Sequence, residues 1–180
     1  EALCVRYRLS YVLMLHVLPK KKYPEAKVVF IGPCIAKRKE AQRDECVDYV
    51  MTFEELHSVF RGLGIELAQA NPYKVAYESV CEAHGFAQAG GVAGAVKSYL
   101  GPKADGIKML QFSDFNKKSI GQMRAWAKTG KVDAQFIEMM ACEGGCVTGP
   151  SAYNDSVSGK RQLNQDLLKR TLKYENYKEE

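Results

Sequence analysis

Phe136-Ile-Glu-Met-Met-Ala-Cys142-Glu-Gly-Gly-Cys146-Val-Thr-Gly-Pro150 is the stretch that decides the predicted fold. Its apolar first half is typical of a buried strand, and its second half is a glycine-rich turn that holds two cysteines. Thiolate sulfur is a soft ligand suited to zinc and iron–sulfur clusters, and Gly144 and Gly145 allow the positive φ angles that turn both sulfurs toward one centre. The alternative is that both cysteines are packed thiols, because free cysteine is often buried. The stretch therefore predicts a strand that ends in a metal-binding loop.

A second cysteine loop follows a second predicted strand. Residues 27–31 form a short β-branched and aromatic run, and Gly32-Pro33 closes it just before Cys34. Strands that alternate with helices predict an α/β fold with a mostly parallel sheet flanked by helices. In such a sheet ligands bind at the carboxyl ends of the strands, where both cysteine loops are expected.

The remaining pattern predicts one domain over residues 1–180. A Thr52-Phe-Glu-Glu55 capping box begins one helix, and a glycine-rich turn at 85–91 precedes another. The spacing of these glycines does not match a dinucleotide-binding fingerprint. Further strands are expected at 46–51, 106–112 and 133–140, and helices at 2–18, 115–128 and, within a terminal region 157–180, at 162–177.

Charge and cysteine content exclude several classes of protein. The net charge of +5 is spread along the chain, and the runs at 20–22 and 38–39 are too short for a nucleic-acid-binding stripe. Six cysteines at irregular spacing do not form the disulfide framework of a small secreted domain, so we expect a reducing cytoplasm. The apolar run at 11–18 is too short to span a membrane, so no membrane insertion is expected.

Lys37 and Glu40 follow Cys34 at the spacing of helical turns. A lysine beside a thiolate can donate a hydrogen bond to an anionic ligand, and a glutamate can orient that lysine. Taken without the other loop, the two side chains are more typical of an ordinary charged surface.

Together, P-C-x-x-K-x-x-E at 33–40 and E-x-M-A-C-x-x-G-C at 138–146 form a specific pair of motifs. The chain resembles the catalytic domain of the [FeFe]-hydrogenases, in the C-terminal region of the large subunit, from about Ser10 to Pro150. This resemblance implies a [4Fe-4S] cluster joined through a cysteine sulfur to a diiron subcluster that carries CO, cyanide and a dithiolate bridge. It also implies reversible reduction of protons to H2 with electrons from ferredoxin or a similar carrier.

The resemblance assigns a role to each matching residue. Cys34 and Cys142 resemble ligands of the cubane cluster, and Cys146 resembles the cysteine that bridges the two subclusters. The remaining matches surround the cluster. Lys37 matches the lysine that donates a hydrogen bond to a cyanide, Glu40 the glutamate that supports it, Met140 a methionine packed beside the subclusters, and Gly90 with Gly91 the glycine turn close to the diiron ligands.

The chain departs from the family pattern in two places. The first cysteine motif, which supplies the remaining cubane ligand and a proton-relay thiol, is not in this sequence, and the surroundings of Cys4 do not match it. We therefore expect the isolated chain to hold no complete cluster and to be inactive without the N-terminal part of the protein and the cluster maturation proteins. Gly32 also stands where a methionine is usual, and residues 148–151 replace a Gly-Gly-Gly-Gln tail.

Two other functions remain open. The departures at Gly32 and at 148–151 are similar to the branch of the family that senses hydrogen, so a hydrogen- or redox-sensing module is one alternative. An iron–sulfur assembly or binding protein without a diiron unit is the other. Lys37 and Glu40 count against this last function, because a plain cubane has no cyanide to bind.

Overall fold

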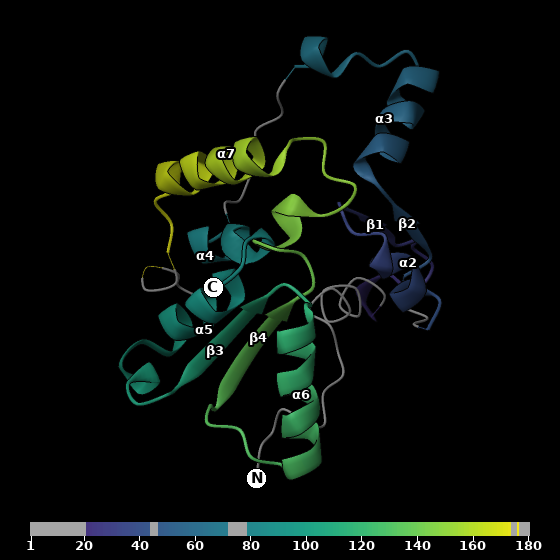
Figure 1. Cartoon of the computed structure of the whole chain (residues 1–180). Coiled ribbons are helices and arrows are strands. Elements are labelled where there is room, and N and C mark those ends of the chain that lie inside the picture. The colour runs from purple at the N-terminus through teal and green to yellow at the C-terminus, as the bar shows by residue number, and fades with distance from the viewer. Residues whose placement is uncertain (1–20, 44–46, 72–78, 174–175, 177–180) are drawn as a thin grey trace. The chain divides into compact units, whose positions relative to one another are not determined.

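The computed structural model describes residues 21–43, 47–71, 79–173 and 176. The chain divides into two compact units, residues 1–73 with 150–153 and residues 74–149 with 154–180, whose relative positions are not determined (Figure 1). The helix expected at 2–18 and the cysteines at 4 and 46 lie outside the described residues. The single domain over 1–180 stays a prediction.

The first unit contains a βαβ motif. Strand β1 (Val29–Ile31) pairs in parallel with β2 (Tyr49–Met51), and helix α2 (Ala36–Ala41) lies in the connection between them. Val28 and Val47, which precede the two strands, are buried. Both strands were predicted from their β-branched composition, and both are shorter than expected.

Helix α3 (Phe53–Gly62) begins at the predicted capping box. The Thr52 hydroxyl accepts a hydrogen bond from the Glu55 N–H, and the Glu55 carboxylate accepts one from the Thr52 N–H. The short turn η2 (Leu67–Gln69) follows. The start of α3 expected from the sequence is confirmed.

The second unit is built on a parallel strand pair, β3 (Met109–Ser113) and β4 (Phe136–Met140). Helix α6 (Lys117–Thr129) connects them and covers one face of the sheet, where the Trp126 ring packs edge-on against Phe112 at a centroid distance of 5.4 Å. The predicted α/β fold with parallel strands flanked by helices is confirmed.

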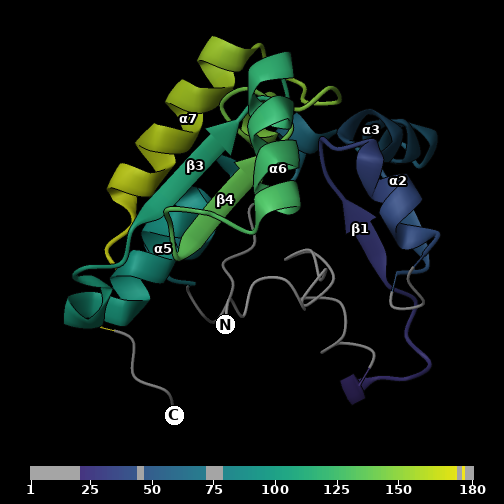
Figure 2. The ribbon, with the colours of Figure 1, turned by 60° about the horizontal axis from the view of Figure 1, so that its bottom comes forward.

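Helix α5 (Gly91–Leu100) covers the opposite face of the β3–β4 pair (Figures 1 and 2). Ala93 and Ala95 are buried, and such small side chains let the helix approach the strands closely. Short helical segments precede and follow α5: α4 (Cys81–His84), η3 (Gly85–Ala87) and η4 (Gly101–Ala104).

Helix α7 (Ser156–Lys169) differs from the predicted terminal helix at both ends. It begins six residues before position 162, because the Asp155 carboxylate accepts hydrogen bonds from the N–H groups of Val157 and Ser158. It ends at Lys169, and Arg170 already has extended backbone angles, so the expected helix to 177 is wrong. Within the described ranges, no helix is long and apolar enough to cross a membrane.

Candidate metal centre

The predicted cysteine loop is a compact turn between β4 and the short helix η5 (Cys146–Thr148). Gly144 and Gly145 have φ angles of +81° and +101°, in the left-handed region that glycine tolerates best. The Gly145 N–H donates to the Cys142 carbonyl at 3.0 Å, and the Thr148 hydroxyl donates to the Gly145 carbonyl at 2.9 Å. The loop that carries both thiols is therefore closed by its own hydrogen bonds.

The glycine turn before α5 packs directly on this cysteine loop. The Ala89 N–H donates to the Gly144 carbonyl at 3.1 Å. A Cβ atom on Gly145 would lie 2.6 Å from the Ala89 nitrogen and 2.7 Å from the Ala87 carbonyl oxygen. The structure thus brings the predicted 85–91 turn, with Gly90 and Gly91, next to the loop of Cys142 and Cys146.

Glu138 holds the glycine turn in place from the middle of β4. This side chain is buried, and its two carboxylate oxygens accept hydrogen bonds of 2.7 Å from the N–H groups of Gly90 and Ala93. The positive end of the α5 dipole also favours a carboxylate at this position. Glu138 received no role of its own from the sequence, although a lone charge inside an apolar strand was a signal that it has buried partners.

Met140 ends β4 two residues before Cys142 and is partly buried. Its backbone pairs with Ser113 of β3, so the strand register fixes where the cysteine loop begins.

The other predicted cysteine lies in the first unit, after β1. Cys34 is partly exposed, and its carbonyl accepts a hydrogen bond from the Lys37 N–H at 3.3 Å. The Lys37 ammonium and the Glu40 carboxylate form an ion pair on α2, with exposed side-chain fractions of 20% and 30%. The expected pairing of these two side chains is present, and it fixes the direction of the lysine.

The candidate ligands are divided between the two units. Cys34 belongs to the first unit, and Cys142 and Cys146 belong to the second. Within the described part of the chain, no three His, Cys, Asp or Glu side chains gather as a group that could hold a metal ion. The individual roles assigned to the site residues from the sequence stay predictions.

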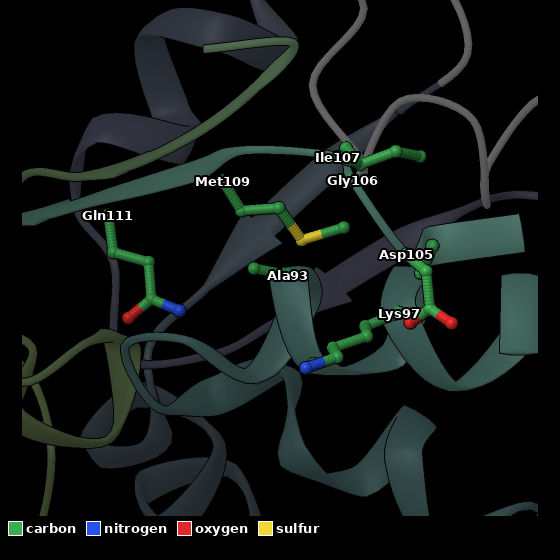
Figure 3. A pocket seen from close by; sticks show the side chains of 9 residues that line it. Ala93, Lys97, Asp105, Gly106, Ile107, Met109 and Gln111 are labelled. Atoms are coloured by element: carbon green, nitrogen blue, oxygen red, sulfur yellow. The ribbon is translucent and has the colours of Figure 1, made fainter. Parts of the chain in front are cut away.

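A separate open hollow of about 440 Å³ lies in the second unit between α5 and β3. Figure 3 shows Gln111 at one end, Asp105 at the other and Met109 between them. The Gln111 amide oxygen also lies 2.9 Å from where a Cβ of Gly90 would be, so this side chain links the hollow to the glycine turn. None of the candidate metal ligands lines the hollow.

Parallel βαβ motifs with cysteine loops after β1 and β4 define an α/β protein whose thiols lie at strand ends. Residues 10–150 match the family model for the iron only hydrogenase large subunit, C-terminal domain. The chain therefore belongs to this family.

Solved structures of [FeFe]-hydrogenases share the fold. The apo form of HydA1 from Chlamydomonas reinhardtii is 18% identical, with a TM-score of 0.54, over 87% of this chain and 57% of that one. A variant of the same enzyme is 24% identical, with a TM-score of 0.53, over 88% and 59% of the two chains. An [FeFe]-hydrogenase studied for oxygen inactivation of its H cluster is 20% identical, with a TM-score of 0.52, over 88% and 58%. The chain thus spans less than two thirds of these structures.

Proposed function

We propose that Cys34, Cys142 and Cys146 bind an [FeFe]-hydrogenase type of metal centre, and that the whole protein catalyses the reversible reduction of protons to H2. The observation that carries this proposal is the packing of the glycine turn against the cysteine loop, fixed by the 3.1 Å hydrogen bond from Ala89 to Gly144. The backbone of the turn comes so close to Gly145 that a Cβ on this residue would overlap it, so the cysteine loop can pack here only with glycine at this position.

The three thiols are a suitable donor set for iron and sulfide, because soft thiolates favour iron–sulfur clusters. Cys34 and Cys142 would hold the [4Fe-4S] cluster, and Cys146 would bridge it to the diiron subcluster. When bound, that group supplies the redox chemistry, and the protein supplies position and electrostatics.

Lys37 would donate a hydrogen bond to an anionic ligand of the centre. Its ion pair with Glu40 limits the directions that the long lysine side chain can take. This pair supports a centre with ligands such as cyanide over a plain iron–sulfur binding protein, which gives the lysine nothing to bind.

A backbone hydrogen bond within the first unit involves the residue that precedes Cys34. Ser151, five residues after Cys146, donates its N–H to the carbonyl of Pro33 at 3.1 Å, and Pro33 directly precedes Cys34. Both residues belong to the first unit, so this hydrogen bond fixes residue 151 beside the motif of Cys34.

A hydrogen- or redox-sensing module is the second candidate function, and two observations favour it. A Cβ on Gly32 would lie 3.0 Å from the Phe30 ring, so an aromatic ring lies where the family's usual methionine would begin. Thr148, in place of a glycine, donates to the Gly145 carbonyl and tightens the cysteine loop. Both changes alter the packing and hydrogen bonds around the proposed centre.

Iron analysis of the protein in its full-length form, matured with the diiron cofactor, tests the metal site. We expect Cys34→Ser, Cys142→Ser and Cys146→Ser each to lower the bound iron. Cys81→Ser is the matched control, because the Cys81 thiol donates to the Leu167 carbonyl and belongs to neither motif. Unchanged iron content in all three motif variants would refute the proposed centre.

Hydrogen evolution by the same matured protein separates the two functions. Rapid turnover that is lost in Cys146→Ser supports the enzyme, whereas a protein that binds the cofactor and turns over slowly supports the sensor. The proposed partners are a ferredoxin-like electron carrier, the maturation proteins and the rest of the polypeptide, in a reducing cytoplasm.

A further inference from the structure

Helix α7 lies outside residues 10–150, which match the family domain, yet it packs on the segment that carries the third cysteine. Gly159 of α7 is buried, and a Cβ at this position would lie 3.4 Å from both the Cγ2 atom and the carbonyl oxygen of Val147. This close contact places the next residue of the helix, Lys160, beside the loop.

The side chain of Lys160 lies across the centre of the cysteine loop. Its Cε and Nζ atoms are both 2.3 Å from the position that a Cβ of Gly144 would occupy. Gly144 therefore leaves room for the lysine chain as well as taking a positive φ angle.

The charge of Lys160 has no acidic partner among the described residues, where no carboxylate lies within 4.0 Å of its ammonium group. Lysine is seldom buried without such a partner, and Lys160 is partly buried. Glu143, the acidic residue of the loop, is exposed. The ammonium group thus faces the loop with its charge unneutralised.

This charge lies close to both cysteines of the loop. Cys142 and Cys146 are each two residues from Gly144, and two residues span at most about 7 Å of extended chain. The backbone of each cysteine thus lies within about 8 Å, the screening distance at physiological ionic strength, of the Gly144 backbone that the lysine covers. Because the ammonium group lies over Gly144, in the middle of the loop, both cysteines are its near neighbours along the chain.

We propose that Lys160 is a positioning residue that gives the Cys142–Cys146 loop a positive potential, so that the loop attracts an anionic metal cluster. The choice of ligand class rests on the proposed function, but the potential itself does not. Unlike the site residues expected from the sequence, Lys160 lies outside residues 10–150 that match the family model.

The potential can be measured on the reduced chain without any cluster. Iodoacetate and iodoacetamide alkylate the same thiolate, but only iodoacetate is anionic, so the ratio of their rates at one pH reports local charge and cancels the thiolate fraction. Mass spectrometry resolves each cysteine. We expect Lys160→Met to lower this ratio at Cys142 and Cys146 by about three- to tenfold, the effect of one charge several ångströms away.

Lys160→Arg should keep the ratio, because it keeps the charge, and Cys34 of the other unit should not respond. Lys169→Met is the matched control, since Lys169 is an exposed lysine at the end of the same helix. The thermal midpoint of each variant confirms that it is folded. An unchanged ratio in folded Lys160→Met overturns the proposal, even where the cysteine variants lose iron. A lowered ratio supports the proposal, even where the cysteine variants keep their iron.

Discussion

Gly145 is the residue on which the geometry of the cysteine loop most depends. Its φ angle of +101° is strained for any residue with a side chain, and a Cβ there would overlap the backbone of Ala87 to Ala89. We expect Gly145→Ala to lower the free energy of unfolding by roughly 1–3 kcal/mol or more, because strained backbone and backbone overlap add. Urea denaturation of the purified chain measures the loss.

Gly94→Ala is the control for this substitution. Gly94 lies within α5 and is exposed, and a Cβ at this position would meet no atom within 4 Å outside its own helix. Alanine there should raise the stability by about 0.5–1 kcal/mol, because it favours the helix. Equal effects of the two alanines would contradict the special role of Gly145.

Residues of the site differ in how far the sequence could predict them. The cysteines and the pair Lys37 and Glu40 stand in motifs whose spacing carries chemical information. Lys160 stands in an ordinary polar helix, and only the tertiary contact with Gly144 gives it a place at the loop. Contacts between elements distant in sequence leave no local pattern, so this lysine could not be found before the structure.

Helix α3 has no fully buried side chain, so its capping box is important for its stability. Thr52 is itself buried and accepts from the Glu55 N–H at 3.2 Å. We expect Thr52→Ala to cost about 1 kcal/mol of stability, and Thr52→Ser to cost little because serine also caps helices. Circular dichroism during denaturation compares the variants, and equal losses would argue against the hydroxyl as the cause.

Helix α7 should lose its first turn in acid. Hydrogen bonds from Ser158, and then from Val157, hold the pKa of Asp155 below its usual range. Because the folded pKa is lower than the unfolded value of about 3.9, the cap stabilises fully above that value and is lost as the pH falls through the folded pKa. Amide protection of Val157 and Ser158, measured by NMR, should therefore decrease when the pH is lowered below about 4.

Asp155→Asn is the comparison for this acid effect. Asparagine caps helices as well as aspartate does but does not titrate, so the protection of the same two amides should stay level with pH. A parallel fall in both proteins would place the acid sensitivity elsewhere in the chain.

At the scale of the whole molecule, local patterns predicted the type and order of the longer described helices and strands, but not every boundary. The end of α7 is an example, because apolar spacing continues to Leu172 while the helix ends at Lys169. The division into two units could not be predicted either. Strand composition shows that β1 and β3 exist, but it does not show that, in the part of the chain that the structure describes, each pairs with one other strand.

This division makes a shared metal site testable, because the single tryptophan reports on one unit only. Trp126 packs on Phe112 in the second unit, whereas Cys34 belongs to the first. Zn²⁺ serves as the probe, since three thiolates and a water can complete its tetrahedral shell. At 100 times its dissociation constant it should stabilise the chain by about 2.7 kcal/mol and raise the urea midpoint of Trp126 fluorescence.

If the two units share the ion, Cys34→Ser must reduce this shift although the substitution and the tryptophan lie in different units. Cys142→Ser and Cys146→Ser should reduce it as well, and Cys81→Ser should leave it intact. A full shift in Cys34→Ser would mean that zinc is bound by the second unit without the first. A reduced shift in Cys34→Ser is the outcome that linkage requires for a shared ion, because an ion stabilises only those parts of the chain whose folding its ligands require.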